Sequence, residues 1–492
     1  MLAGTGSDVG KSILATALCR IFLQDGYHPA PFKAQNMALN SYATPDGLEI
    51  GRAQAVQAEA CRLAPHTDMN PLLLKPSSDH TSQVVLHGRP IGNRDAYAFW
   101  GVKGNDMGVK RDDSIEPDFR YEVCSSFDRL ASRYNPVVME GAGSISEMNL
   151  RDHDLVNLPM ARHAGAAVIL VADIDRGGVF ASCYGSIKLQ SPEDQHLIRG
   201  IIVNKFRGDL RLFDEGRHML EQYCGVPVLG VVPYCKDLHI DAEDSVVLER
   251  RDKEHGARGK QHGAETSQSS PLTSQIKIAV VLLRHLSNFT DFDMLERDPR
   301  VHLFYTDKPD DLEQADIIIL PGTKATLDDL YHLRLSGLAA AILKAHAKGT
   351  VIMGICGGFQ MLGQQVDDPD GIEGDTLSMP GLGLLPIHTV MTQQKTTRQV
   401  EFDFQGQRCR GYEIHQGVST AADPFVIHNH CIGTYIHGCL DNAAVVDFLL
   451  NDNRQHTPTM SIEDYREQQY DYLADHVRRH IDMDRLYQIL KT

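Results

Sequence analysis

The sequence contains no closely spaced cysteine pair, no excess of positive charge and no apolar run long enough to cross a bilayer. Ten cysteines scattered over 492 residues match neither a disulfide framework nor a zinc site, which favours a reducing, cytoplasmic environment. The 48 Lys and Arg against 65 Asp and Glu give a formal charge of −17, which argues against binding to nucleic acid or anionic membranes. The longest apolar runs, such as AGAAVILVADI, end well short of the roughly 20 residues of a membrane helix. No signal-peptide pattern stands at the start.

The length predicts more than one domain. Short β-branched runs such as PVVMEGAG, AAVILVADI and GIIVNKF end in glycine or charge, which is typical of buried parallel strands. Residues 1–248 are therefore predicted to form one α/β domain, and the polar residues 249–275 a linker. Strand signals resume in IKIAVVLL, so residues 276–445 are predicted to form a second α/β domain. Residues 446–492 are predicted to be a helical tail, and both domains to contain mainly parallel sheets.

A glycine-rich stretch, GTGSDVGKS, lies almost at the start of the chain. Gly10, Lys11 and Ser12 match the end of a phosphate-binding loop, whose backbone amides hold phosphate, whose lysine neutralises it and whose serine reaches Mg²⁺. An amphipathic helical pattern follows, and a helix N-terminus favours an anion. The usual first glycine would be at Thr5, but it stands at Gly4, so a simple helix-capping turn is the alternative. So little chain precedes the loop that we expect either a very short first strand or a start downstream of the natural one.

Magnesium at such a loop needs a carboxylate. Glu140 follows an apolar strand in VVMEGAGS, beside glycines that leave room for a ligand. Glu49, in DGLEIGRAQ, is a second candidate, although acidic residues outside the core are commonly only solvated.

The second domain contains GICGGFQ after a predicted strand. A nucleophile at a tight strand-to-helix turn needs small neighbours, and three glycines flank Cys356. We therefore expect an exposed, reactive thiol, with a buried structural cysteine as the alternative. A thiolate needs a basic partner, and both His437 and His415 lie next to predicted strands. The residues alone do not distinguish the two histidines.

Several motifs together resemble a known family. GICGGFQ, GYEIHQG and GTYIHG look like a class I, triad-type glutamine amidotransferase domain, and the first domain resembles the ATP site of dethiobiotin-synthetase-like P-loop enzymes. FKAQNMALNSY, EIGRAQAVQAEA, MNPLLLKP, MEGAGSISEMNL, VADIDRGGVFAS, NKFRGD and LPGTKAT resemble the cobyric acid synthase family. The resemblance covers nearly the whole chain outside the linker and the tail.

The resemblance implies that His437 is the partner of Cys356 and that His415 has a structural or glutamine-pocket role. Ordinary glutamine amidotransferases carry a glutamate two residues after this histidine, where the present sequence has Cys439. This leaves open which group orients His437, with Asp441 or a backbone carbonyl as the candidates. Backbone amides near Gly322 and Gly357 are candidates for the oxyanion hole.

The resemblance also implies ATP and Mg²⁺ as cofactors and a corrinoid and glutamine as small-molecule substrates. The implied ATP residues are Thr5, Gly6, Asp8, Gly10, Lys11, Ser12 and Asn204, and the implied metal residues are Ser12, Glu49 and Glu140. Candidate substrate residues in the motif segments are Lys33, Arg52, Lys75, Asp173, Arg176 and Arg207. The alternative for each of these residues is a charged side chain on the surface that contacts only water.

The implied reaction is amidation of four carboxylates of adenosylcobyrinic acid a,c-diamide. Alternatives are the a,c-diamide synthase reaction on cobyrinic acid, or another carboxylate amidase. An alternative of another class is a deviant P-loop switch ATPase with a non-catalytic second domain. A homo-oligomer is left open.

Overall fold

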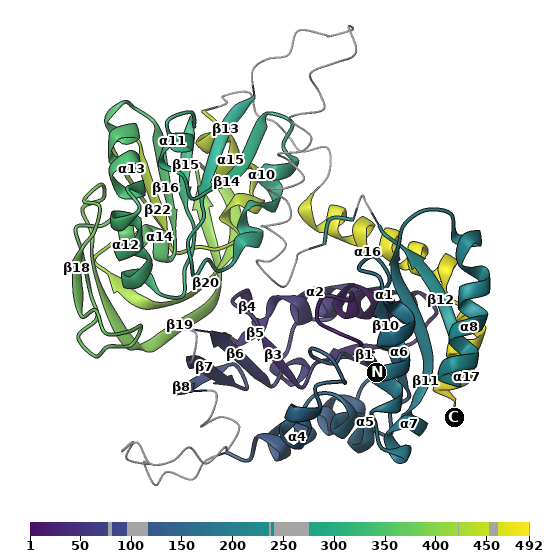
Figure 1. Ribbon diagram of the computed structural model, residues 1–492. Helices are drawn as coiled ribbons and strands as arrows, with labels where there is room; N and C mark the ends of the chain where they lie inside the picture. Colours follow the sequence, from purple (N-terminus) through teal and green to yellow (C-terminus); the bar gives the residue numbers. More distant parts are fainter. Residues whose placement is uncertain are drawn as a thin grey trace, which may run out of the picture.

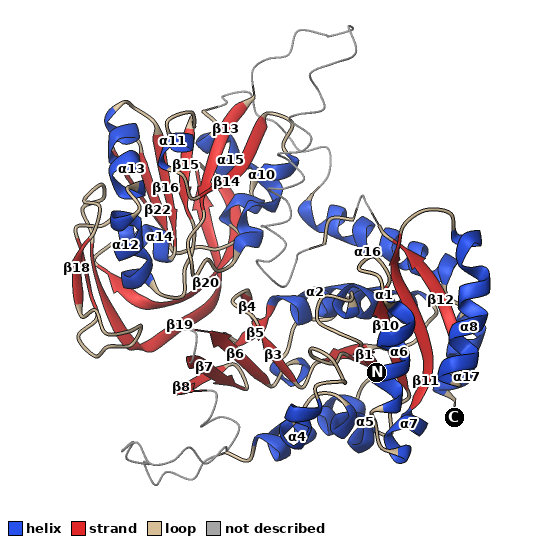
Figure 2. Ribbon diagram, viewed as in Figure 1, coloured by secondary structure: helices blue, strands red, loops and turns tan. Residues whose placement is uncertain are grey.

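The computed structural model describes residues 1–76, 81–95, 117–235, 238–240, 275–421, 423–451 and 461–491. Two α/β domains lie side by side, each with its own group of strands flanked by helices (Figures 1 and 2). Among the described residues, no helix combines the length and the apolar character needed to cross a membrane. The predicted linker lies outside the described residues except for Gln275.

The first domain is built on a parallel sheet with the strand order β1-β10-β11-β12. Its strands are β1 (Leu2–Gly4), β10 (Val168–Asp173), β11 (Ile198–Phe206) and β12 (Val228–Pro233). The parallel pair β2 (Ala30–Phe32) and β9 (Val137–Met139) extends it through a bridge between Leu2 and Glu140. The strands are buried on both faces, as their continuous apolar sequences predict. The strand before the phosphate loop is very short, with three residues.

Helices cover this sheet, and smaller strands lie at its side. The helices are α1 (Lys11–Gln24), α2 (Arg52–Ala60), α4 (Phe119–Ala131), α5 (Leu158–Ala164), α6 (Val179–Lys188), α7 (Pro192–Leu197) and α8 (Asp214–Cys224). One small sheet contains β3 (Gln35–Met37), β6 (Leu72–Pro76), β7 (Thr81–Leu86) and β8 (Arg89–Asp95). A hairpin of β4 (Ser41–Ala43) and β5 (Glu49–Gly51) leads directly into α2.

The second domain contains a six-stranded sheet of order β14-β13-β15-β16-β22-β21, in which only β21 is antiparallel. Its strands are β13 (Ile276–Val281), β14 (Val301–Thr306), β15 (Ile317–Leu320), β16 (Val351–Ile355), β21 (Phe425–His428) and β22 (Cys431–Thr434). A second sheet contains β17 (Gln365–Asp367), β18 (Ser378–Pro380), β19 (His388–Phe404) and β20 (Gln407–Ser419). The helices are α10 (Asp293–Arg297), α11 (Pro309–Leu312), α12 (Thr326–Leu335), α13 (Leu338–Ala347), α14 (Gly357–Leu362) and α15 (Ala443–Leu449). The prediction of two α/β domains with mainly parallel sheets is confirmed.

The predicted tail folds back onto the first domain. It forms α16 (Ile462–His480) and α17 (Met483–Leu490), and α16 lies along α1 (Figure 1). Apolar residues of α16, among them Leu473 and Val477, are part of the same buried cluster as Leu14 and Ile21 of α1. The chain therefore begins and ends in one domain.

Candidate active sites

Cys356 occupies a sharp turn between β16 and α14. Its backbone has φ 53° and ψ −110°, a conformation that a residue with a side chain adopts only under strain. The turn lies so close to its neighbours that a Cβ at Gly358 would be 2.0 Å from the carbonyl oxygen of Leu320. Contrary to our expectation of an exposed thiol, Cys356 is only 6 % exposed, but it lines a cavity.

His437 lies against Cys356 and is held by a carboxylate. Its Nδ1 is 2.7 Å from Oδ2 of Asp291, whose other oxygen accepts a 2.9 Å hydrogen bond from the amide of Gly438. Burial alone would lower the pKa of His437, but the charges of Asp291 and of Cys356, with which it also forms a hydrogen bond, raise the pKa to about 10. Cys356, His437 and Asp291 thus form a triad suited to nucleophilic attack on a carbonyl group.

The group that contacts Nδ1 of His437 is Asp291, and not one of the two candidates, Asp441 or a backbone carbonyl. The Asp441 carboxylate instead forms a 3.0 Å ion pair with Arg466 of α16. Asp291 was missed because it comes from η4 (Phe289–Phe292), far away in the sequence from His437. The only local signal was the stretch SNFTDFD, residues 287–293, in the segment that leads from β13 into α10.

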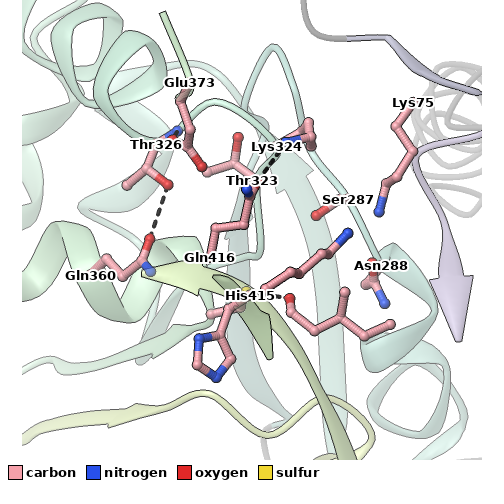
Figure 3. Close-up of a pocket in the computed structure, with 13 residues that line it drawn as sticks. Lys75, Ser287, Asn288, Thr323, Lys324, Thr326, Gln360, Glu373, His415 and Gln416 are labelled. Atoms are coloured by element: carbon pink, nitrogen blue, oxygen red, sulfur yellow. Dashed lines mark hydrogen bonds between the residues drawn. The ribbon is translucent and has the colours of Figure 1, made fainter. Parts of the chain in front are cut away.

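His415 lines the cavity near Cys356 (Figure 3). Its ring stacks on Tyr435 at a centroid distance of 3.8 Å, and its Nδ1 is 2.7 Å from the carbonyl oxygen of Gly417. His415 thus lies in the cavity wall, whereas His437 lies between Cys356 and Asp291.

The two predicted oxyanion-hole glycines flank the triad. The carbonyl of Gly322 accepts a 2.9 Å hydrogen bond from the amide of Ser287, and a Cβ at Gly322 would lie 3.1 Å from Cε1 of His437. A Cβ at Gly357 would be 2.5 Å from Cγ2 of Thr323. Loops after β15 and β16 therefore meet closely beside Cys356.

The cavity beside Cys356 is rich in buried charge (Figure 3). Lys324 and Glu373 lie on its wall, where burial lowers the pKa of Lys324 and raises that of Glu373. Lys395 comes from β19, and Lys75 comes from β6 of the first domain, so both domains line this cavity. Burial also lowers the pKa of Lys395 to about 8, despite its ion pair with Glu49.

The phosphate-loop motif adopts a compact turn before α1. Gly10 has φ 96°, and a Cβ there would be 2.2 Å from Nδ2 of Asn204. That Nδ2 donates to the carbonyl of Val9 at 2.9 Å. The Lys11 ammonium donates to the carbonyls of Gly6 at 3.0 Å and of Gly143 at 2.8 Å. Thr5 is tied to the next loop because its carbonyl accepts a 3.1 Å hydrogen bond from the Ser144 hydroxyl.

Ser12 and Glu140 meet at the end of the loop, as predicted. The Ser12 hydroxyl donates to Oε1 of Glu140 at 2.8 Å, and Lys33 forms a 2.9 Å ion pair with the same oxygen. The amide of Gln57, on α2, donates to Oε2 of Glu140 at 2.6 Å. Gln57 is fully buried and its Oε1 has no hydrogen-bond partner. Sequence reasoning missed Gln57, although it lies in the quoted segment EIGRAQAVQAEA.

Glu49 lies elsewhere. Its carboxylate is held by Lys75, at 2.7 Å, and by Lys395 of the second domain. Burial would raise its pKa, but the two ammonium groups outweigh burial and hold the pKa well below the usual range. These two ion pairs connect Glu49 to neither Ser12 nor Glu140.

The remaining substrate candidates fall into two groups. The first group lies beside the phosphate loop and contains Arg176, Asp173 and Arg207. Arg176 is 3.4 Å from Asp8 of the loop. Asp173 forms a 3.1 Å ion pair with Lys205, and Arg207 forms a 2.7 Å ion pair with Asp175. Lys205 also donates to the carbonyl of Asp8. Arg52 lies toward the second domain, where it pairs with Glu59 and stacks on Tyr42.

Comparison with known proteins assigns both domains. Residues 1–247 match the CobQ/CobB/MinD/ParA nucleotide binding domain, and residues 277–445 match the CobB/CobQ-like glutamine amidotransferase domain. Cobyric acid synthase of Bacteroides fragilis (strain YCH46) is 59% identical over 511 residues, covering 100% of this chain and 98% of the relative. With the same coverage, the cobyric acid synthases of Phocaeicola vulgatus and Salmonella agona are 57% and 43% identical.

The chain belongs to the cobyric acid synthase family. As a member of that family, it is an ATP-dependent amidoligase that obtains nitrogen from glutamine. The cobyric acid synthase assignment and the assembled triad do not support a switch ATPase with a non-catalytic second domain.

Proposed function

We propose that the protein amidates the four peripheral carboxylates b, d, e and g of adenosylcobyrinic acid a,c-diamide to give adenosylcobyric acid. The observation that best supports this function is the buried triad of Cys356, His437 and Asp291 in the same chain as a Lys11–Ser12 phosphate loop. Amide formation from a carboxylate is unfavourable in water, so one site must release ammonia and the other must activate the acid.

In the second domain, the Cys356 thiolate attacks the side-chain carbonyl of glutamine and forms a γ-glutamyl thioester. Backbone amides near Gly322 and Gly357 stabilise the oxyanion, and His437 protonates the departing ammonia. Water then hydrolyses the thioester and restores the thiol. The opposite charges of Lys324 and Glu373 on the cavity wall suit the α-carboxylate and α-ammonium groups of glutamine.

In the first domain, the phosphate loop binds ATP through its backbone amides, Lys11 and the neighbouring Asn204. The γ-phosphate is transferred to a substrate carboxylate, giving an acyl phosphate that ammonia attacks with loss of phosphate. Lys11 and Lys33 stabilise negative charge during the transfer. Lys33 lies 2.9 Å from Glu140, so it can neutralise charge near the metal carboxylate.

The residues at this site fit Mg²⁺. Ser12 and Glu140 supply the hard oxygen ligands that Mg²⁺ prefers, and the unpartnered Oε1 of Gln57 can accept from a water of a hydrated ion. When bound, Mg²⁺ would neutralise charge on the phosphates during their transfer. We do not retain Glu49 as a metal ligand because two lysines already hold its carboxylate.

The corrinoid carries several carboxylates and therefore needs cationic groups in an otherwise acidic protein. Arg176 and Arg207 beside the phosphate loop are the substrate contacts that we propose, and Asp173 holds the neighbouring Lys205. None of the ten cysteines forms a disulfide in the part of the chain that the structure describes, which suits a reducing cytoplasm.

The deciding experiment compares the wild type with Cys356→Ala, supplied with the corrinoid a,c-diamide, ATP and either glutamine or ammonium. We expect the variant to lose amidation with glutamine and to keep it with ammonium. Wild-type protein that amidates cobyrinic acid but not its a,c-diamide would support the a,c-diamide synthase alternative and contradict the proposal.

A further inference from the structure

We propose that Asn40 and Asn288 are positioning residues through which the first domain holds the acid of the glutamine-hydrolysing triad in place. The inference rests on the proposed function, because it concerns how that triad is assembled. It assigns a role in glutamine hydrolysis to the ALNSY segment of the first domain, which lies outside the amidotransferase domain.

Asn288 is the residue of the second domain that makes this connection. It precedes η4 in the left-handed conformation, with φ 53°, and is 4 % exposed. Its Nδ2 donates two hydrogen bonds of 2.9 Å, one to the carbonyl of Ser41 in the first domain and one to the hydroxyl of Tyr412. A single amide thus joins the start of η4 to both domains.

Asn40 supplies the second contact. Its Oδ1 accepts a 3.2 Å hydrogen bond from the amide of Phe289, and its own carbonyl accepts from the amide of Arg52 at 3.2 Å. Asp291 follows within the same short turn, where its amide donates to the carbonyl of Asn288 at 3.1 Å. A shift of the turn at Asn288 or Phe289 therefore moves the carboxylate that orients His437.

Tyr412 extends the contact to the histidine itself. Its ring stacks on His437 with centroids 5.4 Å apart, and it contacts the ring of Tyr42 of the first domain at a tilt of 58°, with centroids 4.8 Å apart. The backbones of Tyr412 and His437 also exchange two hydrogen bonds, of 3.0 and 2.8 Å. The acid and the histidine are thus both braced by residues that contact β4 of the first domain.

The same segment of the first domain is connected to the phosphate site. Ser41 pairs with Gly51 in the hairpin of β4 and β5, and β5 leads directly into α2. From α2, Gln57 donates to Glu140 at 2.6 Å. An unbroken path of short contacts therefore runs from the metal carboxylate to the triad, and glutamine hydrolysis should depend on how this segment docks.

The test uses full-length protein and two disruptive variants. Asn288→Gly removes the amide but tolerates the left-handed backbone, and Asn40→Ala removes the acceptor for Phe289. Asn429→Gly is the matched control, since Asn429 also has a positive φ, of 44°, but is exposed in the turn between β21 and β22, where it contacts His428 and His346.

Two measurements are made on each variant: the kcat and KM for glutamine hydrolysis, and the rate of Cys356 alkylation by iodoacetamide as a function of pH. The titratable groups facing His437 are Asp291, Cys356 and Tyr412, whose ring stacks on the imidazole. Misplacing Asp291 should lower kcat about tenfold or more with less than about a twofold change in KM. The midpoint of the alkylation profile should move up by about one pH unit, because a less stable imidazolium supports the thiolate less well.

Asn429→Gly should behave like the wild type. A fall in kcat without any shift of the alkylation profile would overturn the inference, because it would assign the asparagines a merely structural role. An equal loss in Asn429→Gly would overturn it as well. Wild-type protein that is alkylated normally but does not hydrolyse glutamine would instead contradict the proposed function.

Discussion

Lys395 of the second domain and Glu49 of the first domain form a buried ion pair across the domain interface. Lys75 contacts the other oxygen of Glu49 at 2.7 Å and also donates to the Ser41 hydroxyl at 2.9 Å. One carboxylate thus compensates two ammonium groups that line the cavity beside Cys356. This arrangement is stable only while the carboxylate is present, because unpaired buried charges are strongly destabilising.

Replacing Glu49 with Gln should therefore lower the free energy of unfolding by about 3 kcal/mol or more. Burial lowers the pKa of Lys395 to about 8 despite the attraction of Glu49, and loss of Glu49 would lower it further. The difference in the free energy of unfolding between the wild type and the variant should be greatest at pH values well below about 8, where Lys395 is charged in both proteins. It should narrow as the pH rises to about 8, where the wild-type Lys395 also loses its proton.

Urea denaturation at several pH values measures this difference. Glu313→Gln is the matched control, because Glu313 forms an exposed ion pair with Lys344 at 2.5 Å. The control should change stability little at any pH. Equal effects of the two substitutions would contradict the importance of the buried pair.

Asp291→Asn should lower kcat/KM for glutamine by about 10²- to 10⁴-fold. Burial lowers the pKa of His437, and the charge of Asp291 is the main interaction that raises it to about 10. Without that charge the pKa falls, so His437 loses its proton at a lower pH and can no longer protonate ammonia. The alkaline limb of the pH profile should move from near pH 10 to lower values.

Asp441→Asn provides the comparison for this prediction. Asp441 lies four residues after His437 but pairs with Arg466, so its substitution should leave the profile in place. If the two substitutions had the same effect, Asp291 would not be the acid of the triad.

Gln57→Leu should weaken binding of ATP in the presence of Mg²⁺ by about 10- to 100-fold, the usual effect of removing a residue that orients a metal ligand. The substitution removes the 2.6 Å hydrogen bond to Glu140 and the unpartnered oxygen beside it. Calorimetric titration with ATP, with and without Mg²⁺, measures the change. Gln24→Leu, on the exposed side of α1, is the control. An unchanged magnesium dependence in Gln57→Leu would contradict a role at the metal site.

Arg20→Met should loosen the contact between α1 and α16. Arg20 is 1 % exposed and forms ion pairs with Glu467 at 2.6 Å and with Asp471 at 2.7 Å. Its removal deprives two carboxylates of a partner, but their side chains are 34 % and 52 % exposed and Glu467 keeps Arg62, so we expect the free energy of unfolding to fall by about 1 to 2 kcal/mol. Urea denaturation measures this loss, and Arg211→Met, at an exposed pair, should have no comparable effect. Equal stability of the Arg20 variant and the wild type would contradict the prediction.

The sequence predicted the features that depend on local backbone geometry. Two turns are examples: one has Gly10 before Lys11, and the other has Cys356 between glycines. Small residues are needed to permit the backbone conformation of these turns, so both turns lie where the motifs predict them. Asp291 could not be predicted in the same way, because it is separated from His437 by 146 residues and only the sheet order β13-β15-β16-β22 brings the segments after β13 and β22 together. The pairing of Glu49 with Lys395 spans 346 residues and depends on domain docking. The sequence therefore suggested Mg²⁺ as the partner of Glu49, whereas its carboxylate contacts Lys75 and Lys395.

Because α16 and α17 complete the core of the first domain, the order in which the ribosome releases the chain affects folding. The strands of that domain emerge long before Tyr470, Leu473 and Val477, the buried residues of α16 that cover α1. The second domain, whose elements lie in between, can fold while the first still exposes apolar surface. Nascent chains that stop before residue 461 would carry an uncovered α1, and they should be targets for chaperones and proteases.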